Sequence, residues 1–265
     1  MNKDWISIFF QKSFFSIDPN SQTWIWIENA IRDLGIRMIF CDDRFIQQLQ
    51  QNTNLLIDKV VKIDDRLFEV NILILSRTFE LCPNPFSDLI YVVQTSGTSG
   101  TRKTVFVSER SIWPNVDDFD RIFDLKSFDK IFAASPPTFD PFYVDLFLWI
   151  SKKSTLIFVP TRLKCQSSIL SEILFERQKV SFLQITPTLY KSLSNNLEEI
   201  LTSTDNNFIK YIVMGGEMFP TISSTILSKS STKFFNVYGV TEMSCWQSMT
   251  QVKQSSHESG KLKIY

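Results

Sequence analysis

Short apolar runs alternate with amphipathic stretches along most of this chain. The apolar runs are rich in β-branched and aromatic residues and predict strands, which we expect at 36–40, 68–75, 89–94, 104–107, 130–135, 154–160, 180–186, 209–216 and 233–239. The amphipathic stretches carry apolar residues with the helical period and predict helices, which we expect at 21–35, 108–123, 141–151, 167–178, 187–197 and 219–230. Ser21 and Gly35 suit the two ends of the first helix, and Pro114 is expected to interrupt the second.

Near-continuous apolar strands separated by amphipathic helices predict an α/β fold of mostly parallel β-sheets, covered by helices on both faces. Ligands in such folds bind beyond the carboxyl ends of the strands. The chain has only 7 glycines among 265 residues, and three polar clusters that follow apolar strands contain Gly97 with Gly100, Gly215 with Gly216, and Gly239. Because glycine permits positive φ and close approach to a ligand, these clusters predict a shared ligand pocket.

Composition and charge argue against several classes of protein. The 28 basic residues balance the 28 acidic ones, so no net field favours nucleic acid or an anionic membrane as a partner. No apolar stretch approaches the roughly 20 residues that a membrane-spanning helix needs. The four cysteines are scattered and His257 is the single histidine, which argues against a zinc site and against a Ser–His or Cys–His pair. We expect a cytoplasmic protein whose four thiols are buried and reduced.

The polar segment "TSGTSGTRKT", residues 95–104, follows the apolar run "LIYVVQ". Its glycines, its hydroxyl groups and Lys103 are groups that can bind polyphosphate. The Walker A pattern G-x-x-x-x-G-K-[ST] is disfavoured, because Arg102 stands where its second glycine should be and the following "TVFV" predicts a strand instead of a helix. A Ser/Thr-rich surface turn without a ligand is the remaining alternative.

The longer segment "YVVQTSGTSGTRKTV" resembles the phosphate loop of adenylate-forming enzymes, whose usual form is Y-T-S-G-T-T-G-x-P-K-G. Arg102 replaces the proline of that form and Thr104 replaces the glycine after the lysine. Three further segments resemble the same family in its own order: "TFDPFYVDLF" (138–147), "VMGGEMF" (213–219) and "NVYGVTE" (236–242). "TFDP" and "FNVYGVTE" most resemble adenylation domains that activate β-alanine. The chain is thus similar to the large N-terminal domain of the adenylate-forming, AMP-binding superfamily.

The resemblance implies that ATP and Mg²⁺ are used to activate a small carboxylic acid, an amino acid such as β-alanine, as an acyl-adenylate. Lys103, Thr241 and Glu242 would be catalytic, and Glu242 would also be the Mg²⁺ ligand. Asp140 and Gly215 would bind the substrate, with the carboxylate of Asp140 pairing with an ammonium group. The residues implied to bind ATP come from all three glycine clusters: Thr95, Ser96, Gly97, Thr98, Ser99, Gly100, Lys103, Gly215, Gly216, Asn236, Tyr238, Gly239 and Thr241.

Several of these residues have plainer alternatives. Asp140 precedes Pro141 and would also suit the N-cap of a helix. Outside the motif, Glu242 would be a solvated carboxylate at the start of a helix, and Tyr238 would pack in the core at a strand end. Glu217 is expected to bond nearby backbone and to take no part in the chemistry.

The resemblance covers residues 17–251, and we expect residues 1–251 to form a partial AMP-binding core, incomplete at both ends, followed by a polar tail, 252–265. The Y-x-T-G-D segment of the family, its C-terminal lid domain and a carrier domain do not occur in this sequence. A phosphopantetheine carrier or CoA would be the downstream acceptor, so an acyl-carrier domain is an expected partner beside the acid itself. Because a closing lid completes such sites, we expect weak activity from this chain alone, with a non-catalytic nucleotide- or partner-binding remnant as the alternative.

Overall fold

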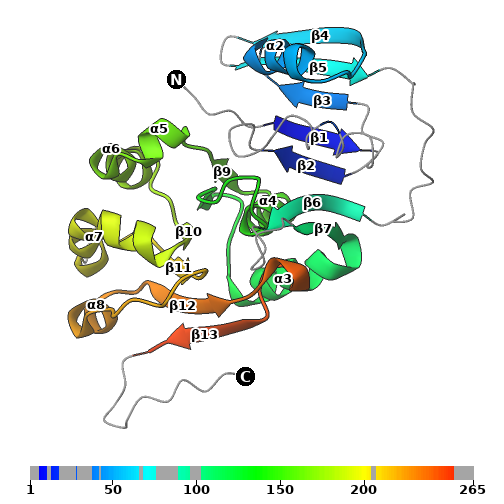
Figure 1. Cartoon of the computed structure of the whole chain (residues 1–265). Helices are drawn as coiled ribbons and strands as arrows, with labels where there is room; N and C mark the ends of the chain where they lie inside the picture. Colours follow the sequence, from blue (N-terminus) through cyan, green and yellow to red (C-terminus); the bar gives the residue numbers. More distant parts are fainter. Residues whose placement is uncertain are drawn as a thin grey trace. The chain divides into compact units, whose positions relative to one another are not determined.

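The computed structural model describes residues 6–10, 13–17, 28, 38–41, 43–65, 68–75, 89–95, 103–203 and 207–253. The chain divides into two compact units, Met1–Arg110 and Ser111–Tyr265, and each unit has its own β-sheet (Figure 1). The predicted first helix, 21–35, lies outside the described residues apart from Glu28, which is helical.

The first unit is built on a seven-stranded sheet with the order β4-β5-β3-β1-β2-β6-β7. Its elements are β1 (Ile6–Phe10), β2 (Ser13–Ile17), β3 (Met38–Cys41), α2 (Asp43–Asn52), β4 (Ile57–Asp65), β5 (Phe68–Leu75), β6 (Leu89–Thr95) and β7 (Lys103–Ser108). Of its strand pairs only β2 and β6 run parallel. The predicted parallel arrangement therefore does not hold for this sheet, because short connections such as residues 66–67 join neighbouring strands as antiparallel hairpins.

The second unit is built on a six-stranded sheet with the order β13-β12-β11-β10-β8-β9. Its strands are β8 (Lys130–Phe132), β9 (Thr155–Ile157), β10 (Phe182–Ile185), β11 (Tyr211–Met214), β12 (Lys233–Tyr238) and β13 (Ser248–Val252). All its neighbours pair in parallel except β12 and β13. This sheet confirms the predicted parallel architecture, although β13 was not predicted from the sequence.

Helices precede or connect the parallel strands of the second unit and cover both faces of its sheet (Figure 1). They are α3 (Glu109–Ile122), α4 (Pro141–Lys152), α5 (Thr161–Lys164), α6 (Ser167–Ser171), a π-helical turn (Glu172–Arg177), α7 (Pro187–Thr202) and α8 (Ser224–Lys229). The predicted interruption near Pro114 is wrong, because α3 continues through the proline and buries Ile112, Val116 and Phe119. The predicted helix 167–178 divides into α6 and the π-helical turn.

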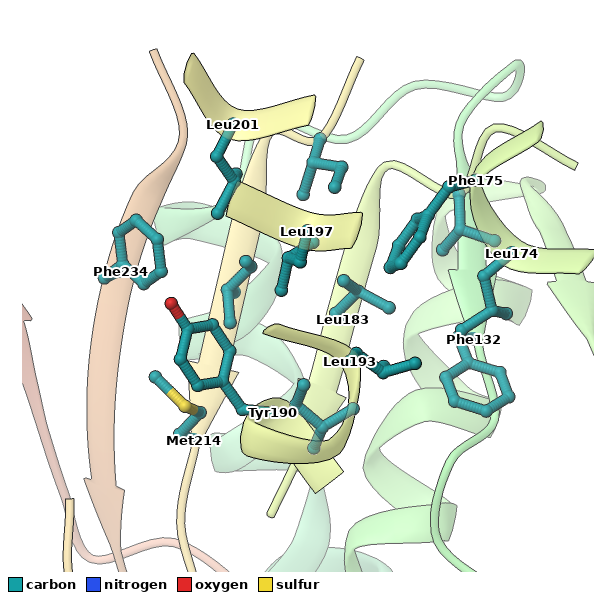
Figure 2. Close-up of a cluster of buried hydrophobic side chains, with 14 of the residues drawn as sticks. Phe132, Leu174, Phe175, Leu183, Tyr190, Leu193, Leu197, Leu201, Met214 and Phe234 are labelled. Carbon is teal, nitrogen blue, oxygen red and sulfur yellow. The ribbon is translucent and has the colours of Figure 1, made fainter. Parts of the chain in front are cut away.

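Alternate residues of the central strands point to opposite faces of the sheet, as expected for strands covered on both sides. On one face, Leu183, Met214 and Phe234 belong to a buried apolar cluster with the side chains of α7, such as Leu193 and Leu197 (Figure 2).

On the other face, neighbouring strand residues pack against Phe123, which directly follows α3. The ring of Phe123 lies 5.1 Å from that of Phe182, 4.9 Å from that of Tyr211 and 5.0 Å from that of Phe235, measured between centroids. Period-two alternation of apolar residues thus fixes which residues reach each helical layer.

Within the described residues, every helix is too short or too polar to cross a membrane. Cys245 is buried as predicted, but Cys165 is exposed, because it follows the short surface helix α5.

Candidate functional site

Two of the three glycine clusters lie beyond the carboxyl ends of neighbouring strands. Gly215 directly follows β11, and Gly239 directly follows its parallel neighbour β12. Because parallel strands end at the same edge of a sheet, the segments that follow them meet there. The third cluster belongs to the first unit, where residues 96–102 lie outside the described part of the chain.

Asp140 reaches the same edge at the start of α4 and contacts the segment after β12. The hydroxyl group of Thr241 donates a hydrogen bond to Asp140 Oδ1 over 3.1 Å, although the two residues are 101 positions apart. Asp140 occupies the N-cap position of α4, but its side chain makes no capping hydrogen bond. The capping role therefore does not explain this carboxyl group, which is directed toward Thr241 instead.

The carboxyl group of Asp140 is in an unusual electrostatic environment. Asp140 is only 6% exposed. Burial raises the pKa of its carboxyl group, and the negative charge of Glu242 raises it further. Hydrogen bonds from Thr241 and Cys245 lower this pKa and so oppose the shift. The groups that shift this pKa include no cation from the described residues. An ionised carboxylate is stable in such a place only beside a cation, and without one the carboxyl group stays protonated.

A chain of polar side chains next to Asp140 was not predicted from the sequence. Gln184 Nε2 donates hydrogen bonds to Asp145 Oδ1 (3.1 Å) and to the carbonyl oxygen of Pro141 (2.8 Å), while Gln184 Oε1 accepts one from Trp246 Nε1 (3.0 Å). These bonds join α4, β10 and the segment after β12. The available signal was a glutamine inside the apolar strand "FLQI" and an aspartate inside the apolar helix "PFYVDLFLWI".

The side chain of Lys164, from α5, contacts the backbone that follows β8. Lys164 Nζ donates hydrogen bonds to the carbonyl oxygens of Ala133 (2.8 Å) and Ala134 (2.9 Å). Burial lowers the pKa of Lys164 to about 8, although the negative charge of Asp145 opposes this shift.

Gly215 and Gly216, the glycines of the second cluster, are required for different physical reasons. A Cβ atom on Gly215 would lie 2.7 Å from Trp246 Cη2 and from two atoms of Val237. Gly215 is thus required by close packing of the Trp246 ring, whereas Gly216 is exposed and adopts a φ of 82°, which favours glycine.

The residues at the two ends of the predicted phosphate loop lie on neighbouring antiparallel strands, β6 and β7. Thr95 at the end of β6 pairs with Lys103 at the start of β7, and Lys103 is exposed. The chain continues after the loop as strand β7, which agrees with the predicted strand–loop–strand unit and contradicts the helix of a Walker A loop. Ser96, Gly97, Thr98, Ser99 and Gly100 lie outside the described residues.

The remaining predicted residues lie on β12 or soon after it. Asn236 is half-buried and pairs with Thr250 of β13. Tyr238 is 67% exposed, so the alternative that it packs in the core is wrong. Glu242 is exposed in a 3₁₀ turn, Thr241–Met243.

Glu217 has the architectural role that was predicted from the sequence. Its Oε2 atom accepts hydrogen bonds from the backbone N–H (2.9 Å) and the hydroxyl group (2.6 Å) of Thr188, in the first turn of α7. It therefore stabilises the start of that helix.

The chain is similar to known proteins in sequence and in fold. The model of the family described as "AMP-binding enzyme" matches residues 26–262. The β-alanine-activating enzyme of Mus musculus is 39% identical over 171 residues, which are 63% of this chain and 15% of that protein. Among solved structures, the Vibrio cholerae adenylation domain AlmE, in complex with glycyl-adenosine-5′-phosphate, aligns with a TM-score of 0.53 and 21% identity over 68% of this chain and 33% of its own.

A second solved structure, the AMPPNP-bound form of the nonribosomal peptide synthetase FmoA3, aligns with a TM-score of 0.51 and 23% identity over 62% of this chain and 17% of its own. These structural similarities support the predicted fold. The matched segment is a small part of the curated relative, so the chain spans only about a seventh of that protein's length.

Proposed function

Because the chain belongs to the AMP-binding enzyme family, we propose that it takes part in activating a small amino acid such as β-alanine with ATP. ATP supplies the α-phosphate that the substrate carboxylate attacks, giving an acyl-adenylate and pyrophosphate. The protein must orient this attack and stabilise the charge that develops on the phosphate oxygens.

The hydrogen bond between Thr241 and Asp140 is the observation that carries the proposal. It brings Thr241, which the family resemblance implies to bind ATP, next to a buried carboxyl group with no cation among the described groups that shift its pKa. An ammonium group from the substrate would allow Asp140 to ionise and would place the substrate beside Thr241. A fatty acid would offer no such charge, so the geometry favours an amino acid.

The residues of the nucleotide site have the chemistry that MgATP requires. The exposed carboxylate of Glu242 is a hard oxygen donor of the kind that Mg²⁺ prefers, and the exposed ring of Tyr238 offers a flat surface for adenine. Thr95, Ser96, Thr98, Ser99 and Lys103 are proposed to bind the β- and γ-phosphates, with Lys103 supplying the positive charge.

Binding of MgATP to the purified chain, measured by titration calorimetry, tests the nucleotide site. Lys103→Ala and Glu242→Ala each remove one charged contact and should weaken binding by roughly 10- to 100-fold, since such contacts contribute about 1.5–3 kcal/mol. Lys229→Ala and Glu199→Ala, which remove exposed charges from α8 and α7, should bind as the wild type does. Unchanged binding in both site variants would show that the site is assigned wrongly.

Substrate charge is tested with Asp140→Asn. This variant keeps an acceptor for Thr241 but cannot pair with an ammonium group, so it should bind β-alanine at least about tenfold more weakly. Propionate, which lacks the amino group, should bind the variant and the wild type equally. Equal loss of both ligands would indicate that Asp140 only supports the fold.

The acyl acceptor and the role of the chain by itself also belong to this proposal. We propose a phosphopantetheine carrier or CoA as the acceptor, and cytoplasm as the location. A non-catalytic nucleotide- or partner-binding remnant is the second candidate. Binding of MgATP without any amino-acid-dependent exchange of pyrophosphate would support that second candidate.

A further inference from the structure

The segment that carries Thr241 and Glu242 is a long connection between two antiparallel strands. It begins at Gly239 after β12 and ends at Trp246, before Gln247 donates its backbone N–H to the carbonyl oxygen of Tyr238 over 2.9 Å. Tyr238 then pairs with Ser248 of β13, where the regular ladder resumes. We name residues 239–246 the β12–β13 connection.

The side-chain amide of Gln247 folds back into this connection, although the residue is exposed. Its Oε1 atom accepts a hydrogen bond from the backbone N–H of Val240 over 2.9 Å. Its Nε2 atom lies 3.3 Å from the carbonyl oxygen of Met243, 3.2 Å from that of Cys245 and 3.5 Å from that of Val240. The side chain of Gln247 therefore forms hydrogen bonds near both ends of the connection and in its middle.

The backbone conformation of the connection explains why these hydrogen bonds are needed. Ser244 and Cys245 both adopt positive φ, 61° and 83°, a conformation that is unfavourable for residues other than glycine. A Cβ atom on Gly239 would lie 1.6 Å from the carbonyl oxygen of Cys245, so the two ends of the connection are in close contact. Regular structure is limited to the 3₁₀ turn, in which the N–H groups of Met243 and Ser244 bond to Val240 and Thr241.

Three other side chains hold the connection from outside. Asn115 of α3 accepts a hydrogen bond from the backbone N–H of Trp246 over 2.9 Å, Gln184 Oε1 of β10 accepts one from Trp246 Nε1 over 3.0 Å, and Asp140 accepts the bond from Thr241. None of the three reaches Met243 or the backbone of Val240. Among the described residues, those two positions are held by the amide of Gln247, and they lie on either side of Thr241 and Glu242.

We propose that Gln247 is a positioning residue, which acts through the backbone to hold Thr241 and Glu242 in the arrangement that binds MgATP. The inference rests on the proposed function for the identity of the ligand. An amide is the required group, because its oxygen accepts from Val240 while its N–H groups donate to carbonyl oxygens. A carboxylate at this position would face carbonyl oxygens with no hydrogen to donate.

Two variants and one control test the role. Gln247→Met has a similar length and no hydrogen-bonding amide, and Gln247→Glu keeps the acceptor but loses the donors. Gln251→Met changes an exposed glutamine on β13 and is the matched control. Calorimetry should show MgATP bound about tenfold more weakly by Gln247→Met, at least as weakly by Gln247→Glu, and unchanged in Gln251→Met.

Amide hydrogen exchange separates positioning from general stability. The amide of Val240 should exchange faster in Gln247→Met, while amides of β10 and β11 should keep their wild-type protection. Loss of stability alone would leave the MgATP dissociation constant of the folded protein unchanged. Wild-type protein that bound no MgATP would overturn both proposals, whereas wild-type binding that both Gln247 variants leave intact would overturn only the positioning role.

Discussion

Asp145 should make the protein less stable as the pH rises from mildly acidic values. Its side chain is completely buried, Oδ1 accepts the bond from Gln184, and Oδ2 has no hydrogen-bond partner among the described residues. Burial raises its pKa well above the usual range, although the charge of Lys164 and the bond from Gln184 lower it. In the unfolded chain the same group should ionise at its ordinary pKa of about 3.9.

The size of the effect follows from proton linkage. Above pH ~4 and below the pKa of the folded state, the folded protein binds one more proton at Asp145 than the unfolded chain. The free energy of unfolding then falls by about 1.4 kcal/mol per pH unit as the pH rises. The stabilisation is complete below the unfolded pKa and is lost as the pH rises to the folded pKa. Asp145→Asn removes this dependence and keeps an oxygen that accepts from Gln184.

Urea denaturation of the wild type and Asp145→Asn between pH 4.5 and 7.5 measures the difference. As the pH rises, the free energy of unfolding of the wild type should fall relative to that of the variant by about 1.4 kcal/mol per pH unit, until the pH reaches the pKa of Asp145 in the folded state. Asp124→Asn is the control, because the hydrogen bond from Lys126 lowers the pKa of exposed Asp124. That contribution is present above pH ~4 and is lost only below it, so the control should show no slope in this range. Parallel pH profiles for Asp145→Asn and the wild type would refute the reasoning and would mean that Asp145 is ionised in the fold.

Three further substitutions test the packing, one connection and one helix cap. Leu197→Ala in the buried cluster should lower the free energy of unfolding by about 2–5 kcal/mol in urea denaturation, and a loss below about 1 kcal/mol would contradict the packing shown in Figure 2. Gly239→Ala should displace the β12–β13 connection and weaken MgATP binding, because its Cβ atom would lie 1.6 Å from the carbonyl oxygen of Cys245; normal binding would contradict this close approach. Thr186→Ala should lower stability by about 1 kcal/mol, since Thr186 caps α7 by accepting from the N–H of Leu189; a change below about 0.3 kcal/mol would show that the cap contributes little.

The sequence predicted the sheet of the second unit because its strands are buried on both faces. The run "YIVM" is apolar throughout and "FLQI" has a single polar residue, Gln184, which is typical of parallel strands covered by helices. The strands β1, β2, β4 and β13 were missed, since segments such as "SFFSI" and "SMTQV" lack that pattern and depend on partners in the sheet. Pro114 was expected to interrupt α3, but burial of the flanking apolar residues outweighs the loss of one backbone hydrogen bond.

The candidate site was predicted only where short motifs carry it. Glycines after strands indicated the edge of the sheet at which Asp140 and Thr241 lie, and "TFDP" and "NVYGVTE" contain the Asp140–Thr241 contact. The bonds from Gln184 to Asp145 and from Trp246 to Gln184 join residues 39 and 62 positions apart, and no local pattern reveals such pairs. The role of Gln247 depends on how the connection folds back on itself, so it could be seen only in the structure.

Amino-acid-dependent exchange of pyrophosphate into ATP tests the central proposal most directly. The assay should use the native polypeptide that contains this sequence, with β-alanine and α-aminoadipate as substrates and propionate as the control without an amino group. The proposal predicts exchange that depends on an amino acid, that requires Mg²⁺ and that is lost in Asp140→Asn. Absence of exchange with every acid tested, from a protein that is folded and binds MgATP, would contradict it.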